Sequence, residues 1–120
     1  MNIEQIHEYC LSLHGVTEDM PFGEDTLVFR VKSKIFALLN LEGEIRINLK
    51  CDPIRAIALR EEFSAIIPGY HMNKQHWNTV IMNGSLKKDL ITSLIDHSYE
   101  LIVECLPKIK KEELKRLKKK

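Results

Sequence analysis

Three short segments in the first half of the chain have the residue patterns of strands, at residues 26–31, 34–40 and 45–50. In the third, apolar and polar residues alternate in the order Ile45, Arg46, Ile47, Asn48, Leu49, Lys50. This period of two is typical of a half-buried strand. The second segment is almost wholly apolar, which indicates a central strand. The connections at residues 32–33 and 42–44 are short, so the sequence predicts an antiparallel meander.

Three other segments have the period of an amphipathic helix. The first covers residues 3–14, with Asn2 as its N-cap and Gln5 as the capping-box partner. The second begins where Asp52 precedes Pro53, a strong helix start. Its expected apolar side is formed by Ile54, Ile57 and Ala58. The third is long, with Ser85 as its predicted cap and an apolar stripe that includes Ile91, Leu94, Ile95 and Ile102.

The remaining segments complete the predicted fold. Residues 16–25 are acidic and are expected to be irregular, whereas residues 64–68 and 76–82 are predicted strands. The order is therefore α-β-β-β-α-β-β-α, or nearly so. This order predicts an α+β domain, with a mostly antiparallel sheet whose helices pack on one face and whose other face is partly open.

The composition is that of an ordinary globular domain. The 120 residues are 44% hydrophobic and 29% charged, which excludes a disordered chain, a collagen and a coiled-coil rod. No apolar run is long enough to span a membrane. The first residues carry Glu4 and Glu8 without Lys or Arg, unlike a signal peptide. We therefore expect a cytoplasmic protein.

The net charge of +1 conceals a strong asymmetry along the chain. Residues 1–26 contain six acids and no Lys or Arg, whereas residues 107–120 contain eight bases and two acids. We expect one domain over residues 1–107 and a basic tail over residues 108–120. The tail could be a short helix or disordered, and it should attract anionic polymers without contributing to the core.

The densest polar and aromatic cluster lies at residues 70–77. Its two histidines, His71 and His76, are five residues apart and have no neighbouring carboxylate, which argues against a zinc site and against a catalytic triad. We expect no enzyme activity, no metal and no cofactor. Trp77 could pack on the sheet and His71 could cap a turn. Alternatively, the loop offers Asn73, Lys74 and His76 as donors to a phosphate or a base.

The cysteines do not suggest a disulfide framework, because three of them lie far apart. Cys10 and Cys105 are expected to be small core residues on helices. Cys51, beside Lys50, could be a mildly activated thiol, although a plain thiol at a strand end is the stronger interpretation.

A second candidate surface is the open face of the sheet. If Ile45, Ile47 and Leu49 face the helices, the polar residues that alternate with them face outward. Arg30 can join this set from the first strand of the meander. The set, which could contact a nucleic-acid backbone, consists of Arg30, Arg46, Asn48 and Lys50. Any half-exposed strand also places polar residues outside, so the pattern alone leaves both interpretations open.

Several stretches of the chain resemble the MmcQ/YjbR family. The matching stretches are Glu18-Asp19-Met20-Pro21-Phe22-Gly23, Phe29-Arg30-Val31 with Lys34 and Phe36, Leu49-Lys50-Cys51-Asp52-Pro53, residues 68–80 and Ser98-Tyr99. The stretch at 68–80 reads PGYHMNKQHWNTV and is the most specific. The resemblance covers roughly residues 2–107, so the basic tail looks like an addition.

The resemblance implies a frataxin-like (CyaY-like) α+β fold and a double-wing DNA-binding domain. It does not imply iron binding, because Glu4 and Glu8 are too few for an acidic ridge. The leading hypothesis is a small, non-enzymatic, cytoplasmic DNA-binding protein that uses the open sheet face, with the strand pairs at residues 26–40 and 64–82 as wings. The alternative is a domain that binds a small ligand or a protein partner through residues 70–77 and 21–23. The candidate binding residues for either function are Arg30, Lys34, Arg46, Asn48, Lys50, His71, Asn73, Lys74, His76 and Trp77.

Overall fold

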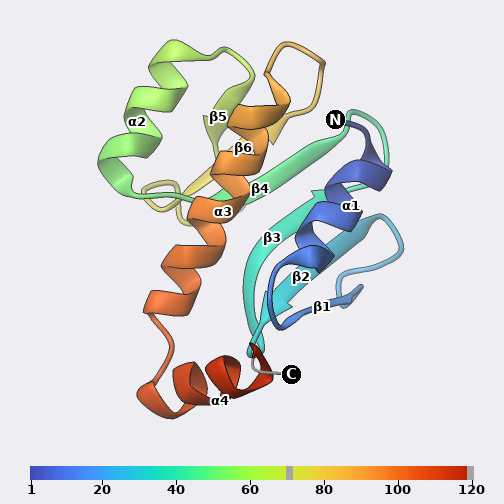
Figure 1. Ribbon diagram of the computed structural model, residues 1–120. Helices are drawn as coiled ribbons and strands as arrows, with labels where there is room; N and C mark the ends of the chain where they lie inside the picture. The colour runs from blue at the N-terminus through green and yellow to red at the C-terminus, as the bar shows by residue number, and fades with distance from the viewer. Residues whose placement is uncertain (70–71, 119–120) are drawn as a thin grey trace.

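The computed structural model of the protein describes residues 1–69 and 72–118 (Figure 1). The elements in chain order are α1 (Ile3–Ser12), β1 (Val16–Asp19), β2 (Thr26–Val31), β3 (Lys34–Asn40), β4 (Arg46–Lys50), α2 (Pro53–Glu62), β5 (Ile66–Pro68), β6 (Trp77–Ile81), α3 (Lys88–Glu104) and α4 (Lys108–Lys118). This is the predicted α+β architecture, with two elements beyond the expected order, β1 and α4.

The strands form an antiparallel sheet in the order β1-β2-β3-β4-β6-β5. The predicted meander of β2, β3 and β4 is confirmed. The expectation that residues 16–25 are irregular was wrong for 16–19, which pair with β2 from Val16 opposite Val31 to Asp19 opposite Val28. Three of the four residues of β1 are exposed, because an edge strand can form its ladder without a regular apolar pattern.

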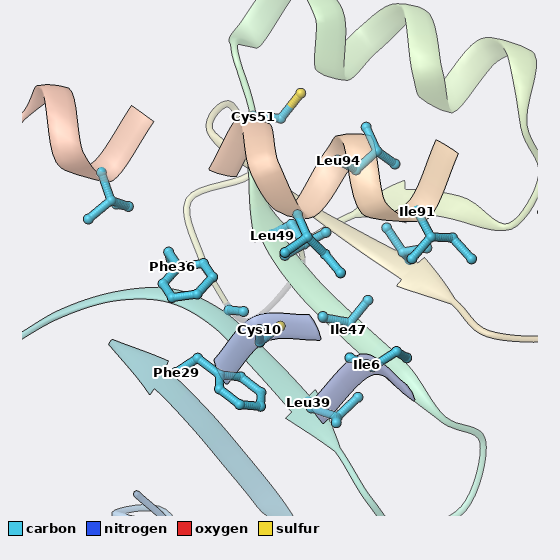
Figure 2. Close-up of a cluster of buried hydrophobic side chains, with 14 of the residues drawn as sticks. Ile6, Cys10, Phe29, Phe36, Leu39, Ile47, Leu49, Cys51, Ile91 and Leu94 are labelled. Atoms are coloured by element: carbon cyan, nitrogen blue, oxygen red, sulfur yellow. The ribbon is translucent and has the colours of Figure 1, made fainter. Parts of the chain in front are cut away.

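The core lies between one face of the sheet and the helices α1 and α3 (Figures 1 and 2). On the sheet side it contains Phe29, Phe36, Leu39, Ile47 and Leu49. On the helix side it contains Ile6, Cys10, Ile91 and Leu94. The predicted capping box is present, since Asn2 Oδ1 accepts from Gln5 N at 2.8 Å and Gln5 Oε1 accepts from Asn2 N at 3.0 Å.

A bulge in β3 changes which side chains face the open side of the sheet. Phe29 lies opposite Ala37, but the next residue, Arg30, lies opposite Ile35, so Phe36 is an extra residue. Phe36 and Ala37 are both buried in the core. Ile35 is consequently left on the open face, opposite Arg30.

The expected apolar side of α2 was wrong. Ile54 is 82% exposed and Ile57 is 55% exposed, whereas Ala56 and Leu59 are buried. The predicted start is correct, because Asp52 Oδ2 accepts from Arg55 N at 3.1 Å. The helix therefore forms as expected but packs through its smaller apolar side.

Two predictions for the last part of the chain also need correction. Ser85 does not cap the long helix, because α3 begins at Lys88 with Lys87 as its N-cap, and Ser85 N instead donates to Asn83 Oδ1 at 3.0 Å. Cys105 is exposed rather than part of the core, since it follows the last residue of α3, where the helical stripe ends.

The segment after Pro107 forms a helix that packs on the domain. Leu114 of α4 is 6% exposed and belongs to the core cluster. His14 Nε2 and Leu114 O are 2.6 Å apart. The expectation that this segment adds nothing to the core was therefore wrong. A helix this short gains its stability from tertiary packing, which the sequence pattern could not reveal.

No helix within residues 1–69 and 72–118 has the length and apolar character needed to cross a membrane.

Candidate functional site

The register of the sheet places the expected polar set on the open face. Ile47 and Leu49 are buried, while the alternating residues Arg46, Asn48 and Lys50 are half-buried. Across the β4–β6 pair, Lys50 lies opposite Trp77, so these two candidate residues are neighbours on that face. The predicted alternation of β4 is confirmed.

Two of the open-face cations already have carboxylate partners. Arg30 Nε lies 3.0 Å from Asp19 Oδ1, and Arg46 Nη2 lies 2.9 Å from Glu44 Oε1. Such surface pairs contribute little stability, so both arginines could exchange their partners for a phosphate. The pairs nevertheless reduce the positive charge of the open face.

The turn between β2 and β3 gathers further cations. Lys32 and Ser33 both have positive φ values, 48° and 72°, as a tight hairpin turn requires. Arg30 Nη1 donates to Ser33 O at 3.2 Å, and Lys34 is exposed at the start of β3. Lys32 Nζ lies 2.8 Å from Glu113 Oε2 of α4. The hydrogen bond from Lys32, followed by its positive charge, lowers the pKa of Glu113.

The Lys32–Glu113 contact brings α4 beside the β2–β3 turn, at one end of the sheet (Figure 1). The sequence of α4, KIKKEELKRLK, contains six Lys or Arg residues and two Glu residues. We call the combination of Arg30, Lys32, Lys34 and the cations of α4 the basic corner. In the sequence, α4 and the β2–β3 hairpin are far apart, and only tertiary packing brings them together.

The loop before β6 has a structural framework of its own. Asn73 Oδ1 accepts from Gln75 N at 2.9 Å, and Asn73 O accepts from His76 N and Trp77 N. Asn73 is therefore a turn-forming residue, with its side-chain oxygen engaged by the loop itself. His76 O accepts from Cys51 N at 2.7 Å, which ties the loop to the end of β4.

Arg60 of α2 holds this loop, a role that the sequence did not suggest. Its Nε donates to Asn78 Oδ1 at 2.6 Å, and its Nη2 donates to the carbonyl oxygen of Lys74. Asn78 is buried on the helix side of β6. The backbone at Lys74 is therefore drawn toward α2, where Lys74, Gln75 and Ile57 line a shallow depression.

The structure consequently divides the candidate residues between surfaces. Arg46, Asn48, Lys50 and Trp77 lie on the open face, Arg30 and Lys34 lie toward the basic corner, and Lys74 lies beside α2. The prediction for His71 lies outside the described residues.

A cleft of about 500 Å³ lies over the middle of the open face. Phe22 and Met72 both line it, together with Leu38 and Asn48 from the sheet. The cleft therefore unites the segments at residues 21–23 and 70–77 that the ligand-binding hypothesis named. Asn48 Oδ1 accepts from Thr79 Oγ1 at 2.5 Å, a contact that holds the Asn48 side chain in place.

Ser98 is a second positioning residue that the sequence did not identify. This fully buried side chain accepts from Lys50 N at 2.9 Å and donates to Phe36 O at 2.6 Å. It thus joins the bulge of β3 to the end of β4. In the sequence, Ser98 belongs only to a stretch that matches the family. A serine within the apolar stripe of a helix does not by itself predict these hydrogen-bond partners.

The Cys51 thiol lies in a buried position. Burial raises the pKa of the Cys51 thiol, so the interpretation as an activated thiol is not supported. Within residues 1–69 and 72–118, no three His, Cys, Asp or Glu side chains are grouped to hold a metal ion.

Comparison with known proteins places this chain among relatives of the same size. The family model described as YjbR matches residues 11–101. The uncharacterized protein YjbR of Escherichia coli strain K12 is 32% identical over 118 residues, which covers 98% of this chain and all of that protein. The uncharacterized protein YbdF of Escherichia coli O157:H7 is 37% identical over 113 residues, or 90% of this chain and 93% of that protein.

The fold comparison agrees with the sequence comparison. A crystal structure of a Deinococcus radiodurans protein matches with a TM-score of 0.89 and 35% identity, covering 94% of this chain and 87% of that chain. The YjbR alignment covers 98% of this chain and so extends past Pro107. The sequence and fold comparisons together show that the chain belongs to the MmcQ/YjbR family.

Proposed function

We propose that the protein is a non-enzymatic, cytoplasmic DNA-binding protein that contacts phosphates through the basic corner. The observation that carries the proposal is the packing of α4, the most basic helix, beside the β2–β3 turn. Buried Leu114 and the 2.8 Å contact between Lys32 and Glu113 hold it there.

The charge distribution supports a local contact with a polyanion. The whole chain has a net charge of +1, so its attraction to DNA must come from a patch. On α4, Lys108, Lys115 and Arg116 are exposed. Fixed on a packed helix, these cations can release counterions from a duplex when they replace them at phosphates.

The basic corner supports the proposal better than the middle of the open face does. There, the cleft is lined by the carboxylates Asp25 and Glu42 as well as by apolar side chains, and carboxylates repel phosphates. Of the two turns in the meander of β2, β3 and β4, the one at residues 32–33 is flanked by cations, whereas the one at 42–44 carries Glu42 and Glu44. The proposed contact therefore uses one hairpin turn and α4.

The proposal is tested by removing exposed cations in matched pairs. The double variant Lys108→Gln/Lys115→Gln removes two charges from α4. The control, Lys87→Gln/Lys88→Gln, removes two lysines that are also exposed, near the start of α3. Binding to two unrelated duplexes is measured by fluorescence anisotropy at several salt concentrations.

We expect the α4 variant to bind both duplexes more weakly and to lower the slope of log K against log salt by about one unit per lost phosphate contact. The α3 variant should keep the wild-type slope. Equal loss in both variants would mean that the attraction is general rather than located at the basic corner. Absence of binding by the wild type at low salt would refute DNA binding.

The variant Lys74→Ala provides a second, independent test. Because this residue lies beside α2 and away from the basic corner, Lys74→Ala should leave the salt slope unchanged. A slope reduced by Lys74→Ala and not by the α4 variant would instead assign DNA contact to the loop before β6.

A further inference from the structure

The cleft on the open face is a separate feature with a chemistry of its own. Its floor is apolar, formed by Ile35 and Leu38 of β3, and Phe22 and Met72 extend this surface from the two flanking loops. Ile35 reaches the floor because the bulge at Phe36 leaves it on the open face. A volume of about 500 Å³ lies within the range of small-molecule sites.

The charged residues among the described lining of the cleft are all acidic. Asp25 and Glu42 lie at the cleft, and Asn40 and Asn48 add amide groups, with no Lys, Arg or His among the described lining residues. Within residues 1–69 and 72–118, neither carboxylate takes part in an ion pair. The Asn48 oxygen already accepts from Thr79, so its amide nitrogen remains as a donor.

We propose that this cleft binds a small organic cation, namely an amine that carries a flat apolar group. The apolar group would cover Leu38 and Ile35 between Phe22 and Met72, and the ammonium would lie between the carboxylates of Asp25 and Glu42. Charge complementarity favours this ligand over an anion, which would meet two carboxylates without a compensating cation among the described lining residues. The proposal does not depend on DNA binding, because the basic corner uses other residues.

Three indole compounds that differ in the side-chain head group test the assignment. Tryptamine carries an ammonium, tryptophol a hydroxyl and indole-3-acetate a carboxylate. Binding is followed by NMR through the methyl signals of Ile35, Leu38 and Met72. Tryptamine should shift these signals at the lowest concentration, tryptophol at a higher one, and indole-3-acetate at the highest or not at all.

Charge-neutral variants separate the roles of the carboxylates and the floor. In Asp25→Asn/Glu42→Gln, the affinity for tryptamine should fall about three- to tenfold, as expected for two exposed charge contacts, while that for tryptophol stays the same. The control, Glu61→Gln/Glu62→Gln, removes two exposed acids from α2 and should change neither affinity.

Three results would overturn the proposal. One is equal affinity for all three indoles, which would mean that the carboxylates select nothing. Another is a set of shifted signals that excludes Leu38 and Met72. The third is no shift with tryptamine at millimolar concentration. Since the assay contains no DNA and the variants leave the basic corner intact, failure here is distinguishable from failure of the DNA-binding proposal.

Discussion

The side chain of Leu114 lies directly against Gly15, nearly one hundred residues earlier in the chain. A Cβ added at Gly15 would clash with Leu114 Cδ1, far inside van der Waals contact. Gly15 also has a φ of 74°, a conformation that glycine adopts readily and other residues adopt at a cost. The contact therefore depends on glycine for two separate reasons, and it docks α4 on the domain.

Gly15→Ala should destabilise the protein by about 1–2 kcal/mol from backbone strain and by a further 1–3 kcal/mol from overpacking. The matched control is Gly43→Ala, because Gly43 has a φ of 69° but no atom within 4 Å of an added Cβ. Urea denaturation of both variants separates the two costs. If Gly15→Ala lowers the free energy of unfolding no more than Gly43→Ala does, the Leu114 side chain moves aside without an overpacking cost, and the prediction is wrong.

Leu114→Ala should lower the free energy of unfolding by about 2–4 kcal/mol, the usual cost of truncating a buried leucine. Leu117, one turn later on α4, is 46% exposed, so Leu117→Ala should stay within about 0.5 kcal/mol of the wild type. Thermal and urea unfolding measure both. A negligible loss with Leu114→Ala would restore the original expectation that the segment after Pro107 does not support the core.

Ser98→Ala should cost about 1–3 kcal/mol, because it leaves the part-buried backbone N–H of Lys50 and the buried carbonyl of Phe36 without their shared partner. The serine at position 93 of the same helix is exposed, and Ser93→Ala is the control, expected to be near neutral. Faster amide exchange at Lys50 in Ser98→Ala would locate the loss at the end of β4. Equal stability of the two variants would contradict the bridging role.

His97 should make the stability depend on pH. Burial, followed by the charge of Arg55, lowers its pKa, and its Nε2 accepts from Asp52 N at 3.1 Å only while the ring is neutral. Between the lowered folded pKa and the unfolded value of about 6.5, the unfolded chain binds more protons. This contribution is therefore complete above that unfolded value and is lost as the pH falls through the folded pKa.

Urea denaturation at pH 7.5 and pH 5.5 tests this sign. The wild type should lose more stability between the two values than His97→Gln does, and NMR titration of the His97 ring should give a midpoint below 6.5. A midpoint at or above the ordinary value, or an identical loss in both proteins, would show that His97 is not responsible.

Local patterns in the sequence were sufficient for much of the fold. The alternation from Ile45 to Lys50 determines which face of β4 is buried, because successive side chains point to opposite sides of a strand. Two helix starts are defined locally, one by Asn2 with Gln5 and the other by Asp52 with Pro53. Their capping hydrogen bonds and backbone angles involve residues no more than three positions apart. The same local information revealed the family.

Tertiary structure decided what depends on residues distant in the sequence. The bulge at Phe36 changed the face of Ile35. The choice of Ala56 over Ile57 as a packing residue depended on which side of α2 meets the rest of the domain. Whether a basic segment becomes a docked helix depended on Leu114 meeting Gly15. The sequence by itself determined the elements and the inward face of β4, because these follow from neighbouring residues. The basic corner and the cleft required the tertiary structure, because each joins segments whose contact is specified by packing and not by any local pattern.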